Sequence, residues 1–266
     1  MLAFWRMSIA ASFMWFYSLI DNFGSFKNIK NLIITNISGF FLGIHFILFF
    51  VALDLTKMAN ATFLGTLTPV FTLVIEIFVL KRRFSFTIYL GLVLALLGAS
   101  IIFFGSSSIS FASKHLLGNF LALGCAFVLA VSFIISEKIR KNESTSIYTR
   151  TLYSSASLTV LLISVFLGTN ILPTNNHIFL LTGFIYLALI PTLLGHNLFY
   201  YSMKYIKPTI VASVPLSEPI IASLIGLLIF PLMGIENQIF TEHKYFTIIG
   251  GLISLLGILI ILNKKK

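Results

Sequence analysis

Two ionisable side chains lie inside apolar stretches of this sequence, Glu218 in VASVPLSEPI and His196 in IPTLLGHNLFYY. Ionisable residues are rare in such stretches, because charge is costly in an apolar medium, and they often mark proton or ligand pathways. An apolar setting favours the protonated form of a carboxyl, and an imidazole changes charge near neutral pH. The chemistry that these two groups indicate is proton exchange.

The spacing of the two groups places them at a similar depth. Glu218 follows Lys207 by about ten residues, or about 15 Å at helical rise, and His196 precedes Lys204 by a similar distance. If the two stretches are antiparallel helices joined by this basic turn, the carboxyl and the imidazole can meet. The alternatives are a structural hydrogen bond for Glu218 and ordinary packing for His196. Further donors and rings beside His196 are supplied by Asn197, Tyr200 and Tyr201.

Prolines interrupt several apolar stretches, and two of them, Pro69 and Pro219, stand at matching places in the two halves of the chain. A proline inside a helix leaves a carbonyl without its partner and bends the helix. Interrupted helices at corresponding positions of two halves point to the central site of a transporter. Hydroxyls near these breaks belong to Thr66, Thr68, Ser213 and Ser217. The alternative for each hydroxyl is a bond to a carbonyl of its own helix.

Four further ionisable residues are candidates for a substrate or proton pathway. His45 and Glu76 also lie within apolar stretches, and Glu76 stands two turns before Arg83, so an ion pair with the basic run is its alternative. Arg6 and Arg150 begin matching stretches of the two halves, and we expect them to extend to lipid headgroups. Binding of a substrate anion is the alternative for both arginines.

The composition predicts a membrane protein. Of 266 residues, 58% are hydrophobic and 10% are charged, with a mean hydropathy of +1.02, which leaves too little polar surface for a soluble fold. The net charge of +10 comes from short clusters between apolar stretches, so it does not indicate nucleic-acid binding. The single cysteine, Cys125, allows neither an internal disulfide nor a cysteine metal site. No nucleotide-binding GxxxxGK[ST] loop, HExxH or GxSxG motif occurs, and we expect no cofactor, no metal and no enzymatic activity.

Nine stretches are long enough to cross an apolar core of about 30 Å as helices. Their lengths exceed those of barrel strands and they do not alternate with period two. The predicted spans are 2–20, 32–53, 58–80, 86–104, 116–135, 147–167, 178–203, 209–232 and 245–262. The fold class expected is an all-α polytopic membrane protein.

The loops between these spans alternate in charge. Fourteen Lys and Arg residues lie in one set of loops and at the carboxyl terminus, against three in the other set. Basic loops stay in the cytoplasm, so the carboxyl terminus is predicted to be cytoplasmic and Met1 external.

An internal repeat accounts for the odd number of spans. Leu67 to Pro69 matches Ser217 to Pro219, Arg6 matches Arg150, and later glycines match in the same order. We predict a first repeat over residues 1–105, without its first helix, and a second over residues 116–263. A unit of five helices, an odd number, makes the second repeat enter the membrane in the opposite sense.

Glycines recur every seven residues in the last span of each repeat. The first repeat has Gly91 and Gly98, and the second has Gly250 and Gly257. Small residues on one face let helices approach closely in lipid, so we expect these faces to pack against neighbouring helices. The alternative is a substrate that passes over the glycines.

The order and spacing of these pieces resemble the drug/metabolite transporter superfamily, EamA type. The resemblance is carried by LAFWRMSIAA, GFFLGIHFILFFVAL, ANATFLGTLTPVFT, GLVLALLGASIIF and the run ALIPTLLGHNLFYYSMKYIKPTIVASVPLSEPI, and it extends over nearly the whole chain. It implies ten helices in two inverted five-helix units. This chain departs from that pattern at the first helix, and it has a basic run, Lys81 to Arg83, where an acidic residue often follows the fourth helix.

The resemblance implies a secondary active transporter, which we expect to export a small metabolite, amino acid or amphipathic compound by proton coupling. The alternatives are a truncated, non-transporting membrane scaffold and, less favoured, a channel. The expected partners are a small-molecule substrate and the lipid bilayer, with a possible homodimer. The expected location is the bacterial inner membrane. The residues expected on the substrate or proton pathway are Glu218, His196, Asn197, Tyr200, Ser217, Pro219, Thr68, Pro69, His45 and Glu76.

Overall fold

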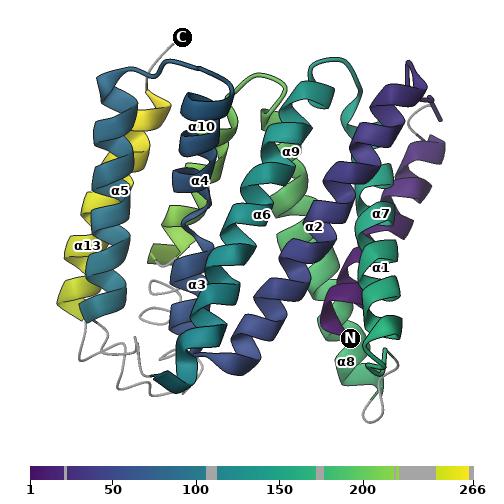
Figure 1. Cartoon of the computed structure of the whole chain (residues 1–266), viewed down its shortest axis with the longest axis horizontal. Helices are drawn as coiled ribbons and strands as arrows, with labels where there is room; N and C mark the ends of the chain where they lie inside the picture. Colours follow the sequence, from purple (N-terminus) through teal and green to yellow (C-terminus); the bar gives the residue numbers. More distant parts are fainter. Residues whose placement is uncertain (21–22, 106–112, 172–176, 219, 222–243, 264–266) are drawn as a thin grey trace. The chain divides into compact units, whose positions relative to one another are not determined.

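The computed structural model describes all residues except 21–22, 106–112, 172–176, 219, 222–243 and 264–266 (Figure 1). Its regular elements in this described part are all helical, which confirms the predicted fold class. The longer α-helices are α1 (Leu2–Ile20), α2 (Ile29–Leu55), α5 (Phe86–Gly105), α6 (Leu116–Arg140), α7 (Thr145–Phe166), α8 (His177–Leu187) and α13 (Lys244–Leu262). The shorter α-helices are α3 (Met58–Gly65), α4 (Thr68–Val74), α9 (Asn197–Ser202) and α10 (Pro208–Ser213). Two π-helices, η1 (Ile75–Val79) and η3 (Ala188–His196), and two 3₁₀ turns, η2 (Ser113–His115) and η4 (Val214–Ser217), complete the described elements.

The predicted spans correspond to these helices in order. The bounds of α1 agree with the prediction, and those of α5 differ by one residue. Three predicted spans are interrupted: 58–80 contains α3, α4 and η1, 178–203 contains α8, η3 and α9, and 209–232 begins with α10 and η4 and continues outside the described residues. Within the described part, seven helical stretches are long and apolar enough to cross a membrane.

The chain divides into two compact units. Unit 1 comprises residues 1–51 and 124–211, and unit 2 comprises residues 52–123 and 212–266. Each unit therefore takes segments from both predicted repeats, so the compact units of the structure are not the repeats themselves.

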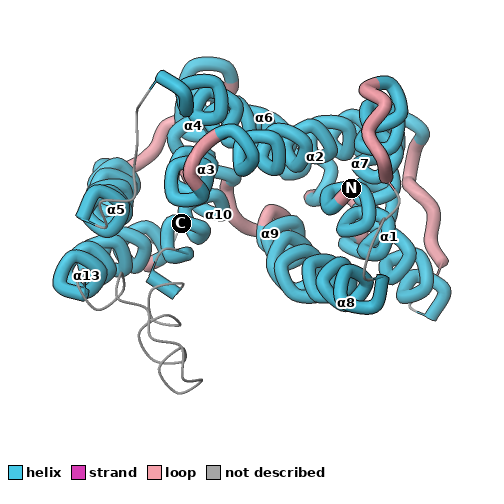
Figure 2. The backbone as a smooth tube through the Cα atoms, turned by 90° about the horizontal axis from the view of Figure 1, so that it is seen from below, coloured by secondary structure: helices cyan, strands magenta, loops and turns pink. Residues whose placement is uncertain are grey.

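Unit 1 is built on the contact of α7 with α1 and α2. The hydroxyls of Ser8 and Ser157 lie 2.6 Å apart between α1 and α7, and these helices lie side by side in both views (Figures 1 and 2). A side chain on Gly39 of α2 would clash with the Leu152 carbonyl of α7, so this glycine allows α2 to approach α7. The Ser144 hydroxyl accepts a hydrogen bond from the backbone N–H of Ile147 and caps the start of α7.

Unit 2 is built on the antiparallel contact of α5 with α13 (Figure 2). A Cβ on Gly98 would lie within 3.0 Å of backbone atoms of Gly250 and Ser254, and a Cβ on Gly257 would lie equally close to Gly91 and Ala95. The four glycines expected at helix contacts thus line this one contact, where the two backbones touch.

Candidate functional site

A proline break in unit 1 organises a cluster of buried polar groups. Pro191 has no N–H to donate to the Leu187 carbonyl, and the hydroxyl of Thr192 donates to that carbonyl instead, at 2.9 Å. The helix here widens into η3, a form that is frequent at functional sites. Thr192 is fully buried, and its carbonyl accepts a hydrogen bond from the Tyr153 hydroxyl at 3.4 Å.

Arg6 joins this cluster, and the expectation that it extends to headgroups is wrong. Only 7% of Arg6 is exposed. Its Nε donates to the Thr192 hydroxyl oxygen at 2.7 Å, and its guanidinium carbon lies 4.4 Å from the centre of the Phe46 ring. A cation over an aromatic face is electrostatically stabilised, which offsets part of the cost of burial. Arg150 is buried as well, at 5% exposed, so its side chain does not extend freely toward solvent.

The two predicted histidines of unit 1 meet at the same phenylalanine. The ring centres of Phe46 and His196 are 5.5 Å apart, those of Phe46 and His45 are 4.8 Å apart, and the two imidazoles are 6.4 Å apart. Nδ1 of His45 lies 3.1 Å from the carbonyl oxygen and 3.0 Å from the sulfur of Cys125. His45 therefore has local polar partners, and Cys125 has a polar contact beyond its expected packing role.

His196 and its neighbour Asn197 carry buried polar atoms of a different kind. Nδ1 of His196 and Oδ1 of Asn197 have no hydrogen-bond partner within the described part of the chain. Burying such groups without a partner costs free energy, and native structures usually reserve them for a water, an ion or a ligand. These two atoms, at the junction of η3 and α9, are thus candidates for ligand contact in unit 1, as is the buried Tyr200 hydroxyl, which also has no partner among the described residues.

Tyr200, also a predicted site residue, lies fully buried one turn further along α9. Its ring centre is 5.6 Å from that of Tyr148 and 5.9 Å from that of Phe133. Its carbonyl accepts a hydrogen bond from Nε of Arg140 at 3.0 Å. These contacts fix α9, and with it His196 and Asn197, against α6 and α7.

Unit 2 contains the two helix breaks at matching places of the repeats. In the first repeat, α3 ends at Gly65 and α4 begins at Thr68, with Pro69 in its first turn; in the second, η4 contains Pro215. Side chains satisfy several carbonyls near these breaks: Ser254 of α13 donates to the Leu216 carbonyl at 3.2 Å. The Thr66, Thr68 and Ser217 hydroxyls donate to carbonyls of Phe63, Gly65 and Val214 in their own segments.

Glu218 follows η4 and has an exposed side chain, whereas its repeat counterpart Thr68 is buried. The sequence indicated a buried setting for this carboxyl, whereas the side chain is exposed. Glu218 belongs to unit 2 and His196 to unit 1, so their pairing stays a prediction. Pro219 lies outside the described residues.

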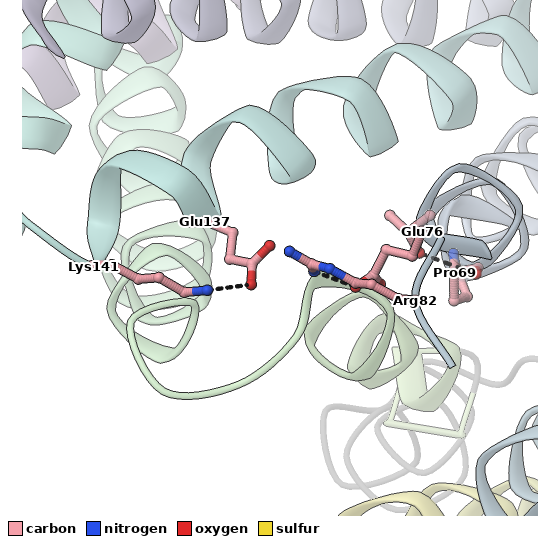
Figure 3. A network of polar contacts seen from close by, with 6 residues as sticks. Pro69, Glu76, Arg82, Glu137 and Lys141 are labelled. Carbon is pink, nitrogen blue, oxygen red and sulfur yellow. Dashed lines mark hydrogen bonds and ion pairs between the residues drawn. The ribbon is translucent and has the colours of Figure 1, made fainter. Parts of the chain in front are cut away.

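Glu76 forms an ion pair within unit 2. Its carboxylate oxygen lies 2.6 Å from a guanidinium nitrogen of Arg82, and Glu76 itself is fully buried in η1 (Figure 3). Lys81, with a φ of 54°, takes the left-handed conformation that turns the chain so that Arg82 reaches back. Of the two interpretations of Glu76, the structure therefore agrees with the ion pair to the basic run, and the partner is Arg82 and not Arg83.

A second group of buried polar side chains in unit 1 was not expected from the sequence. The hydroxyl of Ser38 lies within about 3 Å of the hydroxyls of Ser132, Ser136 and Tyr148, which joins α2, α6 and α7. Glu137 and Lys141, four residues apart at the end of α6, form an ion pair at 3.0 Å (Figure 3). Serines that recur four residues apart on α6 were the only local signal, and hydropathy does not distinguish them from lipid-facing serines.

Comparison with known proteins agrees with this architecture. The sequence model of the EamA-like transporter family matches residues 1–104 and 116–263. A solved structure, titled only as the crystal structure of a protein, matches with a TM-score of 0.70 and 17% identity, covering 96% of this chain and 86% of that one. That likeness shows the fold alone. No curated protein matches the sequence.

Proposed function

The chain belongs to the EamA-like transporter family and is a multi-pass membrane transporter, and we propose that it is a secondary active carrier that exports a small metabolite in exchange for protons. The metabolite is a small polar or amphipathic compound, with amino acids included. The carrier works by binding its substrate at one site that opens to each face of the membrane in turn.

The observation that carries the proposal is a pair of buried atoms at the η3–α9 junction, Nδ1 of His196 and Oδ1 of Asn197, that have no hydrogen-bond partner among the residues the structure describes. They stand next to a proline-induced π-helix, and the ring of Phe46 connects His196 to the buried cation of Arg6. A substrate with a hydrogen-bond donor and an anionic or acceptor group can satisfy these atoms. Substrate that hydrogen-bonds to these atoms removes the free-energy cost of burying them unpaired, and this gain favours binding.

The experiment begins with identification of the substrate, by comparing the metabolites that cells release with and without the gene. Purified protein in proteoliposomes is then assayed for substrate uptake driven by a pH gradient. We expect His196→Phe and Asn197→Leu to abolish uptake, because neither replacement can bond to substrate. Both should raise the melting temperature in detergent, because a polar group without a partner is replaced by an apolar one.

A histidine outside the cluster supplies the matched control. His115 ends η2, directly before α6, with Nδ1 3.4 Å from the Leu55 carbonyl, and His115→Phe should transport like the parent. Parent-like transport by both His196→Phe and Asn197→Leu would contradict the proposed site. A channel would let substrate equilibrate without accumulation or counterflow, and a scaffold would show no flux in any of these assays.

The proposal includes the cellular setting. The carrier resides in the bacterial inner membrane with a cytoplasmic carboxyl terminus, its partners being the substrate and the lipid bilayer, and it forms a homodimer. Native mass spectrometry of the purified protein tests the dimer, and a strictly monomeric spectrum at micromolar concentration would exclude it.

A further inference from the structure

Arg150 is a buried cation with only neutral partners in the described part of the chain. Its guanidinium donates to the Ser18 hydroxyl and to the Gly24 carbonyl. Its carbon lies 4.7 Å from the ring centre of Trp15 and 4.6 Å from that of Phe23. Nε of Arg150 has no hydrogen-bond partner among the described residues. A guanidinium that is 5% exposed and has no carboxylate partner in the described part of the chain is costly to bury, which indicates an anionic ligand.

The same guanidinium borders a pocket of about 410 Å³ in unit 1. Its lining includes the apolar residues Trp15, Ile29 and Leu32 and the polar residues Asn28, Asn36 and Ser154. The Trp15 indole N–H donates to the Ser154 hydroxyl at 2.9 Å, which fixes the orientation of the ring. A ligand of this pocket must therefore carry a negative charge next to an apolar part.

The pocket lies at the end of unit 1 where the basic loops gather. Arg150 is the sixth residue of α7, about 8 Å from the start of that helix at helical rise. The apolar side chains of α1 and α2 next to the pocket are open to the surroundings, with Phe16 64% exposed and Ile29 69% exposed. Tryptophan and arginine at this depth, next to exposed apolar residues, are typical of the headgroup region of a membrane.

We propose that this pocket binds one glycerophospholipid, with its phosphate on Arg150, its glycerol region against Asn28 and Asn36, and its first acyl carbons against Ile29 and Leu32. The site is separate from the cluster around His196 and does not rest on the transport proposal. An arginine can donate two parallel N–H hydrogen bonds to one phosphate, which a lysine cannot do, so arginine is the more suitable residue at this position.

The test is native mass spectrometry of the full chain in detergent, with phosphatidylglycerol and with diacylglycerol of the same acyl chains as probes. The parent should retain one phosphatidylglycerol and little diacylglycerol. Arg150→Gln should lower retention of phosphatidylglycerol about tenfold, as expected for loss of a charge-assisted hydrogen bond. Retention of diacylglycerol should not change.

Two further variants distinguish loss of the pocket from a general loss of positive charge and from misfolding. Lys30→Gln removes an exposed cation near the same end of unit 1 and should retain phosphatidylglycerol like the parent. Asn36→Phe keeps Arg150 but fills the pocket from the exposed face of α2, and it should lose the lipid even if Arg150→Gln does not fold.

Three outcomes would overturn the proposal. The first is equal retention of phosphatidylglycerol by the parent and the folded Arg150→Gln and Asn36→Phe variants. The second is displacement of the lipid by millimolar inorganic phosphate, which would assign the site to a free anion. The third is an equal loss of melting temperature in Asp21→Asn and Arg150→Gln without any change in lipid, which would make Asp21 the partner of the guanidinium.

Discussion

Thr68 and Glu218 occupy matching places in the two repeats but differ in charge and in exposure. The Thr68 hydroxyl is 3.1 Å from the Gly65 carbonyl, and Thr68 is 3% exposed, so its polar group serves its own helix break. Glu218 has an exposed carboxyl directly after η4. Such an asymmetry between otherwise matching halves is expected if one half carries the coupling proton.

Replacing Glu218 with glutamine tests this assignment. Glu218→Gln keeps the size and hydrogen-bonding capacity of the side chain but fixes it in a neutral form. We predict that the variant folds and still exchanges labelled substrate for unlabelled substrate, yet no longer accumulates substrate under a pH gradient. The measurement is the ratio of gradient-driven uptake to exchange in proteoliposomes.

The matched control for this residue lies in the other repeat. Thr68→Val removes a hydroxyl at the corresponding position and should change stability more than coupling, because that hydroxyl satisfies a backbone carbonyl. If Glu218→Gln accumulates substrate as well as the parent does, the carboxyl is structural and the proton takes another route.

At the level of helices, the α5–α13 contact depends on the absence of side chains at four glycines. We predict that Gly98→Leu and Gly257→Leu each destabilise unit 2 by about 1–3 kcal/mol, because a branched side chain forces two touching backbones apart. The measurement is thermal melting in detergent. Gly183→Leu in α8 is the control, since a Cβ there meets nothing within 4 Å. Equal melting of all three variants would show that the glycine faces are not packed together.

The extent of the helices was largely predictable, because apolar length sets the span of a membrane helix. Their interruptions were predictable only where proline signals them, as at Pro191 and Pro215. The π-helix η1 has no internal proline, so the hydropathy pattern predicted one continuous helix through α4 and η1. Its widening accompanies the turn at Lys81 and the pairing of Glu76 with Arg82, which are contacts that no local pattern records.

The candidate site was predictable in its residue types and less so in its partners. His196 and Asn197 stood out as polar residues in an apolar stretch, and in the structure each has a buried polar atom without a partner in the described part of the chain. Arg6 was misread, because depth along a helix does not tell whether a side chain faces lipid or neighbouring helices. Its partner Thr192 lies 186 positions away in the sequence, and only the folded chain brings the two together.

For the molecule as a whole, the basic loops predict an orientation in the membrane, and two contacts within the units bear on this prediction. In unit 1, Glu143 accepts hydrogen bonds from the Lys27 backbone N–H at 3.1 Å and from the Asn31 amide at 2.6 Å, so the loops before α2 and α7 share one end. In unit 2, α5 and α13 are antiparallel, so Leu262 at the end of α13 lies at the same end as the basic run before α5. In each unit, the contact brings basic segments to the same end, as expected if the basic loops of that unit face a single compartment.

Single cysteines test this topology. We predict that a cysteine at the exposed Asn142 and a tag at the carboxyl terminus are reached only from the cytoplasm, whereas a cysteine at Ser107 reacts with an impermeant thiol reagent added outside the cell. The reason is that fourteen cationic residues lie on the side assigned to the cytoplasm, against three on the other, and cations resist transfer across the membrane. The parent chain is the control for background, because its single thiol, Cys125, is buried and should not react. External labelling at Asn142 with protection at Ser107 would show that the topology is the reverse of the predicted one. The phospholipid pocket of Arg150 would then lie in the outer leaflet, because Arg150 and the loop at Asn142 belong to the same end of unit 1.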